Sequence, residues 1–132
     1  MTPLLVFLGA GLGGVARFGV GRLFATQSAS FPWNTLVINV SGSLLITLFA
    51  AMATQKGLSP QLQAFLTVGI CGGYTTFSAF SAETLSLIQS GQWSRATTYA
   101  VASVVLCVLA AFLGMRLGAA LTSPESRLTS PG

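Results

Sequence analysis

The residues best suited to chemistry lie in the middle of a long apolar stretch. Residues 69–81 read Gly-Ile-Cys-Gly-Gly-Tyr-Thr-Thr-Phe-Ser-Ala-Phe-Ser, which places three glycines and five hydroxyl groups among apolar neighbours. Each glycine costs about 1 kcal/mol relative to alanine in a helix interior. A helix that breaks within a membrane requires protein or a cavity to satisfy the freed backbone groups. The segment therefore predicts either a broken helix that forms an ion site or a close, glycine-lined helix crossing.

A break at this position offers ligands to ions of both signs. Carbonyl oxygens suit a hard cation such as sodium, whereas hydroxyls and free N–H groups suit an anion. Phe77 and Phe80 follow the glycines and are three residues apart, so they share one helix face. The edge of an aromatic ring carries partial positive charge and can face an anion. Packing against another helix or against lipid is the alternative role for the two rings.

Polar residues also recur at every fourth position in two other apolar stretches. One set consists of Thr35, Asn39 and Ser43, and the other of Tyr99, Ser103 and Cys107. Residues with this spacing share one face of a helix. An amide in hydrocarbon needs hydrogen-bond partners, so Asn39 is expected to face a neighbouring helix or a polar cavity. The two sets predict a polar track through the membrane, with helix contacts and an interfacial tyrosine as the alternative.

The composition indicates that lipid, rather than water, surrounds most of the chain. Of its 132 residues, 52% are hydrophobic and 6% are charged, a balance that a soluble domain of this size does not tolerate. Four stretches approach the roughly 20 apolar residues that a spanning helix needs: 4–24, 36–53, 62–88 and 96–121. The first is expected to be a retained helix, because no lysine or arginine precedes its apolar part. Residues 1–121 are thus expected to form a four-helix transmembrane domain, and residues 122–132 a disordered tail.

Catalytic and nucleic-acid-binding functions are disfavoured by what the sequence lacks. There is no histidine and no aspartate, and the two carboxylates are Glu83 and Glu125. Hydrolytic triads and metal-ligand clusters cannot be assembled from this set, so the chain is not expected to be an enzyme. Cys71 and Cys107 fall within apolar stretches and are expected to be small packing residues. The six basic residues are scattered and form no nucleic-acid patch.

The basic residues are distributed almost evenly between the two expected sides of the membrane. Lys56 and Arg127 fall on one side, and Arg22 and Arg95 fall on the other. Because the lysine and arginine bias normally sets orientation, a chain with this balance could insert either way. Two oppositely oriented copies could then pair about a two-fold axis in the membrane plane. An antiparallel homodimer is the hypothesis, and a single orientation with arginines that reach the interface is the alternative.

Three segments together resemble the Fluc/CrcB family of fluoride channels. They are Gly72-Gly73-Tyr74-Thr75-Thr76-Phe77-Ser78-Ala79-Phe80-Ser81-Ala82-Glu83, Asn39-Val40-Ser41-Gly42-Ser43 and Gly14-Val15-Ala16-Arg17. The resemblance implies an all-α integral membrane protein with four transmembrane helices and a broken third helix, assembled as an antiparallel, dual-topology homodimer. It also implies a passive, fluoride-selective channel that exports fluoride across the bacterial inner membrane. The implied partners are fluoride, a second copy of the chain and the lipid bilayer.

The resemblance also assigns roles to individual residues along the fluoride path. Phe77 and Phe80 match the phenylalanines that line the pore of the family, and Asn39 matches its pore asparagine. Four further residues are similar to the polar track of the family: Thr35, Ser78, Tyr99 and Ser103. The family string usually reads TTFSTF, and Ala79 replaces its last threonine. This substitution removes one hydroxyl beside the two phenylalanines.

A structural sodium ion at the dimer interface is the cofactor that the resemblance implies. The matching ligands are the backbone carbonyls of Gly72 and Thr75. Glu83 lies one turn beyond the second phenylalanine, where a paired helix-end carboxylate is expected.

Two other classes of membrane protein share part of the pattern. Small multidrug-type transporters also have four helices and dual topology, but they use a carboxylate within the first helix, where this chain has Arg17 and no acid. A non-conducting assembly subunit would use its polar residues only to bind partner helices. Such a subunit would tolerate apolar replacements of the two phenylalanines without any change in ion flux.

Overall fold

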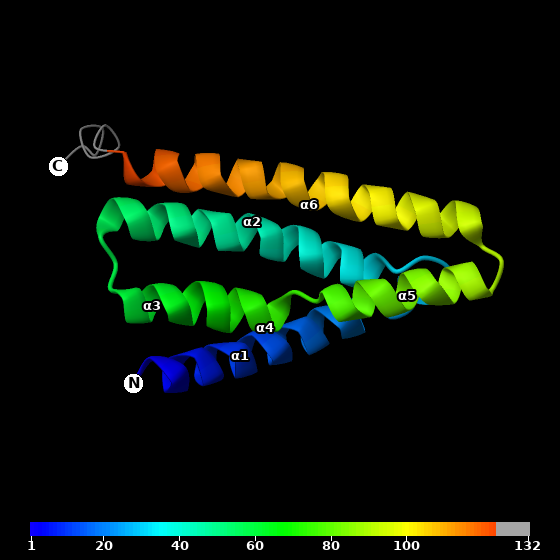
Figure 1. Ribbon diagram of the computed structural model, residues 1–132, viewed down its shortest axis with the longest axis horizontal. Helices are drawn as coiled ribbons and strands as arrows, with labels where there is room; N and C mark the ends of the chain where they lie inside the picture. The colour runs from blue at the N-terminus through cyan, green and yellow to red at the C-terminus, as the bar shows by residue number, and fades with distance from the viewer. Residues whose placement is uncertain (124–132) are drawn as a thin grey trace.

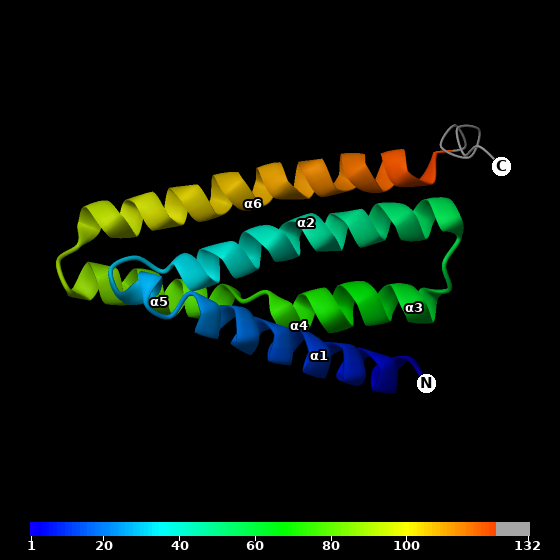
Figure 2. The ribbon, with the colours of Figure 1, turned by 180° about the vertical axis from the view of Figure 1, so that it is seen from behind.

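The computed structural model describes residues 1–123, which form a bundle of long helices. The elements in chain order are α1 (Thr2–Leu23), the 3₁₀ helix η1 (Gln27–Ala29), α2 (Trp33–Lys56), α3 (Pro60–Ala64), the π-helix η2 (Phe65–Cys71), α4 (Gly72–Tyr74), α5 (Phe77–Gln89) and α6 (Trp93–Thr122). This range contains no strand, which confirms the all-helical prediction. Figure 1 shows α2 between α6 and the row formed by α3, α4 and α5, with α1 along the other side of that row, and Figure 2 shows this order from behind.

Three helices within residues 1–123 are long and apolar enough to cross a membrane, namely α1, α2 and α6. They correspond to the first, second and fourth stretches that the sequence predicts to span. The third stretch, 62–88, is divided among shorter elements, because one helical segment ends at Tyr74 and α5 begins at Phe77. These elements follow one another end to end along the bundle (Figure 1). Of the expected tail, Thr122 belongs to the last turn of α6, and residues 124–132 lie outside the described residues.

Local sequence signals end α2 and begin the next helical segment. Gly57 ends α2 in the left-handed region with a φ of 61°, which glycine adopts without a steric penalty. Ser59 caps α3, since its hydroxyl accepts a hydrogen bond from the Leu62 backbone N at 3.3 Å, and Pro60 fits the first helical turn. The connection between α2 and α3 is therefore short, and the chain returns along the bundle at once.

Glycines allow helix backbones to approach closely at two crossings. A Cβ atom at Gly9 of α1 would lie 2.7 Å from the Phe65 carbonyl oxygen of η2 and 3.0 Å from the Cα atom of Gly69. A Cβ atom at Gly118 of α6 would lie 2.7 Å from the Leu48 carbonyl oxygen of α2. Small residues permit such contacts between helices in membranes. The first crossing holds α1 against the segment that leads into α4.

We expect Gly9→Ala to lower the thermal unfolding midpoint of the purified protein in detergent, because the new methyl group would collide with the Phe65 carbonyl oxygen. Overpacking of this kind typically costs about 1–3 kcal/mol. Gly11→Ala is the matched control on the same helix, since a Cβ atom there meets nothing within 4 Å. Equal midpoints for the two variants would contradict the close contact between α1 and η2.

Candidate functional site

Two extended residues, Thr75 and Thr76, separate α4 from α5 and are called the extended pair below. Their ψ angles are 158° and 113°. Thr75 ends α4, because its backbone N and its Oγ1 both donate to the Cys71 carbonyl oxygen at 2.9 Å. Thr76 begins α5 as an N-cap whose Oγ1 accepts a hydrogen bond from the Ala79 backbone N at 3.1 Å. A threonine hydroxyl therefore satisfies a backbone group at the end of α4, and another does so at the start of α5.

The side chain of Asn39 on α2 binds the backbone of the extended pair. Its Nδ2 donates to the Thr76 carbonyl oxygen at 3.0 Å, and its Oδ1 accepts from the Thr76 backbone N at 2.8 Å. One amide therefore satisfies both backbone groups of an extended residue. A primary amide has two N–H donors, so within residues 1–123 one N–H of Asn39 remains for another partner.

Backbone carbonyls just before the extended pair and within it, including those of Gly72 and Thr75, lose the donors that a continuous helix would provide. In an α-helix, each backbone N donates to the carbonyl four residues earlier. The Thr76 N would reach the carbonyl of Gly72, but it donates to Asn39 instead. The Ala79 N would reach the carbonyl of Thr75, but it donates to a side-chain hydroxyl. Residues 1–123 contain no cluster of three histidine, cysteine or acidic side chains that could hold a metal ion. The freed backbone carbonyls are therefore the candidate ligands for a hard cation in this part of the chain.

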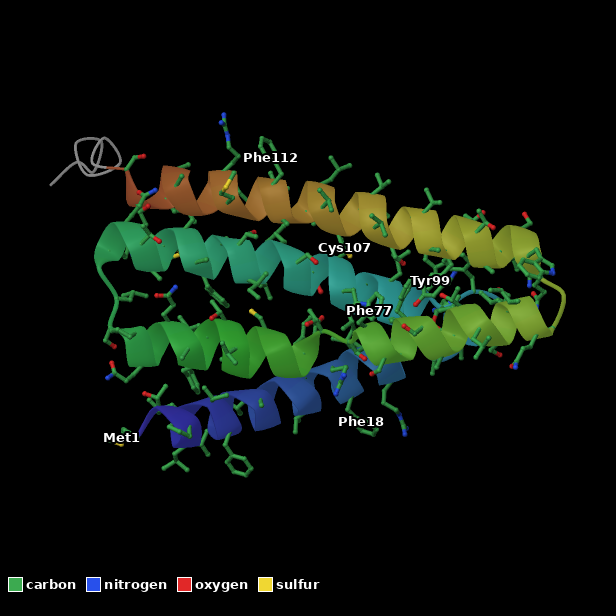
Figure 3. All side chains as sticks on the ribbon, in the orientation of Figure 1. Met1, Phe18, Phe77, Tyr99, Cys107 and Phe112 are labelled. Carbon is green, nitrogen blue, oxygen red and sulfur yellow. The ribbon has the colours of Figure 1, made fainter. Side chains whose placement is uncertain are left out.

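A pocket of about 380 Å³ opens beside the extended pair. Its walls come from α2, the extended pair, α5 and α6. The polar lining residues are Asn39, Ser43, Thr75, Thr76, Ser103 and Cys107, and the aromatic ones are Phe77 and Phe80. In Figure 3, the labelled Phe77 and Cys107 lie in the central part of the molecule. None of the lining side chains carries a formal charge, so an ion in this pocket would be bound by neutral dipoles.

Ser103 provides a hydroxyl that has no partner within the described part of the chain. Its side chain is 7% exposed, and its Oγ is buried without a hydrogen bond. The Ser43 hydroxyl, by contrast, donates to the Asn39 carbonyl oxygen at 2.7 Å. A buried polar group without a partner costs about 1–3 kcal/mol. A bound anion or water in the pocket would remove this cost.

Aromatic rings form a continuous row from the mouth of the pocket to α6. The centroids of Phe77 and Phe80 are 5.3 Å apart, and those of Phe80 and Tyr99 are 5.2 Å apart. Tyr99 is fully buried, whereas Phe77 is 78% exposed. Tilted rings of this kind turn edges as well as faces toward their surroundings. The Phe77 ring is therefore a part of the pocket lining that is largely exposed in the single chain.

Glu83 on α5 is held by two hydroxyl groups behind this row of rings. Its carboxylate accepts from the Thr35 Oγ1 at 2.7 Å and from the Tyr99 hydroxyl at 2.6 Å. The carboxylate is thus paired with these two hydroxyls within residues 1–123, but it lies in the middle of α5 and not at the helix end that the sequence suggested. Hydroxyls from α2 and α6 thus stabilise the one acidic side chain of the described residues.

The structure brings together some of the residues that the sequence predicts for the fluoride path and separates others. Four of them line the pocket: Asn39, Phe77, Phe80 and Ser103. Thr35 and Tyr99 bind Glu83 instead, and Ser78 is exposed, with its Oγ 3.1 Å from that of Thr76. Cys107, which the sequence placed both among the packing residues and in the second polar set, is partly exposed and lines the pocket. The spacing of four residues between Ser103 and Cys107 was the sequence feature that indicated a shared helix face for these two pocket residues.

Long apolar helices around an uncharged pocket with a few polar lining groups define a helical membrane protein with a candidate ion site. The family described as CrcB-like protein, Camphor Resistance (CrcB), matches residues 4–115. The chain belongs to this family and is a multi-pass membrane protein, which confirms the resemblance inferred from its motifs.

Similar proteins from three bacteria bear the name Fluoride-specific ion channel FluC. The relative from Thermus thermophilus is 47% identical over 119 residues, which cover 89% of this chain and 95% of the relative. The relative from Paramagnetospirillum magneticum is 48% identical over 118 residues, with 86% and 92% covered. The relative from Coxiella burnetii is 43% identical over 122 residues, with 89% and 98% covered. The similarity thus extends over nearly the whole of each chain.

We expect Asn39→Leu to lower the thermal unfolding midpoint strongly, because both backbone groups of Thr76 would lose their partner. Each buried group left unsatisfied costs about 1–3 kcal/mol. Asn34→Leu makes the same chemical change on the same helix, where the side chain has no hydrogen bond within residues 1–123. If both variants unfold at the same temperature, the Asn39 amide does not support the extended pair.

Proposed function

We propose that the chain forms a passive, fluoride-selective channel that exports fluoride across the bacterial inner membrane and lowers its toxicity. The observation that carries the proposal is the uncharged pocket lined by Ser103, whose buried hydroxyl has no partner in the described part of the chain. Relatives that are 43–48% identical and named fluoride-specific ion channels support the choice of ion.

The pocket offers the kind of ligands that a small, strongly hydrated anion requires. Fluoride gives up water only where other donors replace it. The Ser103 hydroxyl, the remaining Asn39 N–H and the ring edges of Phe77 and Phe80 can serve as these donors. None of them carries a full positive charge, so none would trap the anion. Conduction requires such weak sites, because the ion must leave as readily as it enters.

Export needs no coupled energy source. Fluoride enters cells as its neutral acid and dissociates in the less acidic cytoplasm. An interior-negative membrane potential then drives the anion outward, with about 2.3 kcal/mol per elementary charge for each 100 mV. A passive pore therefore acts as an exporter under these conditions.

An antiparallel homodimer is part of the proposal. The fourth span would consist of α3, η2, α4 and α5, which run end to end (Figure 1). Support comes from Phe77, which lines the pocket and is 78% exposed, because a second copy packed there would complete the wall. Further support comes from charge, since Lys56 lies at one end of α2 while Arg22 and Arg95 lie near the other end of the bundle. Basic residues at both ends weaken the bias that would select a single orientation.

A structural sodium ion at the dimer interface is also proposed. Its ligands would be the backbone carbonyls of Gly72 and Thr75, which lack the donors of a continuous helix. Bound sodium would neutralise their partial negative charge beside the anion pocket.

Two rival functions make different demands on the structure. A multidrug-type transporter requires a carboxylate in its first helix, and α1 contains none. An assembly subunit that does not conduct would not depend on the rings at the pocket. Replacement of one ring therefore separates a channel from such a subunit.

We expect liposomes with the wild-type protein to release fluoride rapidly and to retain chloride, and Phe80→Ile to release fluoride more slowly. Loss of an aromatic edge worth about 1 kcal/mol corresponds to a decrease of roughly fivefold in rate. Phe18→Ile is the control, because that ring is exposed on α1 away from the pocket. An ion-selective electrode measures both ions. Full fluoride flux through folded Phe80→Ile protein would favour the assembly subunit.

We expect Ser103→Ala to reduce fluoride flux without reducing stability, because its hydroxyl binds no group of the described chain. A hydrogen bond to a charged ligand is worth about 1.5–3 kcal/mol, or roughly a tenfold to hundredfold change in rate. Ser43→Ala is the matched control in the same pocket, where the hydroxyl already donates to the backbone. Flux assays and thermal unfolding are measured on both variants. A decrease in stability without a decrease in flux would assign Ser103 a structural role.

A further inference from the structure

The two cysteines of the chain have different surroundings. Cys107 on α6 is a free, partly exposed thiol that lines the pocket of about 380 Å³. Cys71 in η2 is also free, but it is 1% exposed and is not part of the pocket lining. Only the first thiol can meet a solute that enters the pocket.

We propose that Cys107 is a binding site for soft metal ions, with mercury(II) as the test case. Thiol sulfur is the protein ligand that soft metals prefer. Ser103 precedes Cys107 by four residues on the same helix face, where side chains are neighbours at about 5–6 Å between Cβ atoms. The Ser103 hydroxyl is buried, belongs to a residue that lines the same pocket and has no partner within residues 1–123, so its oxygen can act as a second, weaker ligand.

The pocket favours a reagent without net charge. Ile46, Val104 and the two phenylalanines make much of its wall apolar, and no charged side chain lines it. Mercuric chloride is a neutral, linear molecule that can enter such a space. A mercury–sulfur bond forms as the S–H bond and one mercury–chlorine bond break. The products are the Cys107 S–HgCl adduct, a proton and a chloride ion, and no electron is transferred.

The adduct would close the fluoride path, and this consequence rests on the proposed function. It would occupy the pocket next to Phe77 and Phe80 and would engage the Ser103 hydroxyl that is expected to bind fluoride. Mercury would therefore inhibit transport through one residue on α6. The buried Cys71 provides an internal reference for the selectivity of the reaction.

The experiment uses the full-length protein in liposomes, with mercuric chloride as the probe and fluoride efflux and bound mercury as separate measurements. The variants are Cys107→Ser, Cys107→Ala as a second replacement, and Cys71→Ala. We expect one mercury per chain by mass spectrometry in the wild type and in Cys71→Ala, and none in either Cys107 variant. Each protein is compared with its own mercury-free flux. Flux should fall to background only where mercury binds, and dithiothreitol should restore it.

Two results would overturn the proposal: mercury that still binds to the Cys107 variants, or mercury bound at Cys107 with undiminished flux. A protein that releases no fluoride even before mercury is added would contradict the proposed function instead. In that case, the mercury count alone would still decide whether Cys107 binds the metal.

Discussion

The arrangement of the site depends on one amide that binds the backbone of one residue. Asn39 pairs with both the N–H and the carbonyl of Thr76, which is 37 residues later in the chain. Lipid offers no water to backbone groups, and each one left unsatisfied there costs several kcal/mol. An extended residue between two helices is therefore stable only with such a partner. The same bonds divert the Thr76 N–H from Gly72, so the freed carbonyl and the position of α5 both follow from this amide.

Close packing on two sides holds the extended pair where the amide can reach it. On one side, Gly9 of α1 admits the π-helix backbone within a distance that any larger residue would prevent. On the other side, Gly42 of α2 leaves room for Tyr74 and Thr75, since a Cβ atom there would lie 3.2 Å from the Tyr74 ring and still closer to the Thr75 methyl group. A π-helix often marks a functional region. Dipoles fixed on packed helices keep their direction better than dipoles on loops.

Local patterns predicted the helices and the family, but not all partners of the polar side chains. Apolar length was sufficient to place α1, α2 and α6, because each is one uninterrupted helix. The fourfold spacing placed Thr35 and Asn39 on one face, yet the first binds Glu83 and the second binds Thr76. Periodicity describes one helix at a time, whereas these bonds join helices far apart in sequence. The sequence could not predict that the Ser103 hydroxyl lacks a hydrogen bond. This depends on which polar groups within residues 1–123 come close to it in the fold, and none of them bonds to it.

The one carboxylate of the described residues lies close to the pocket and does not line it. Tyr99 connects the two, since its ring contacts Phe80 and its hydroxyl binds Glu83. A carboxylate facing the pocket would repel an anion, and the repulsion is strong where the dielectric constant is low. The hydroxyls of Thr35 and Tyr99 point their positive ends at Glu83 and stabilise its charge where it lies. The donors left for the pocket, the Ser103 hydroxyl and one Asn39 N–H, are neutral and few. Neutral donors in small number suit an ion that must pass through rather than remain bound.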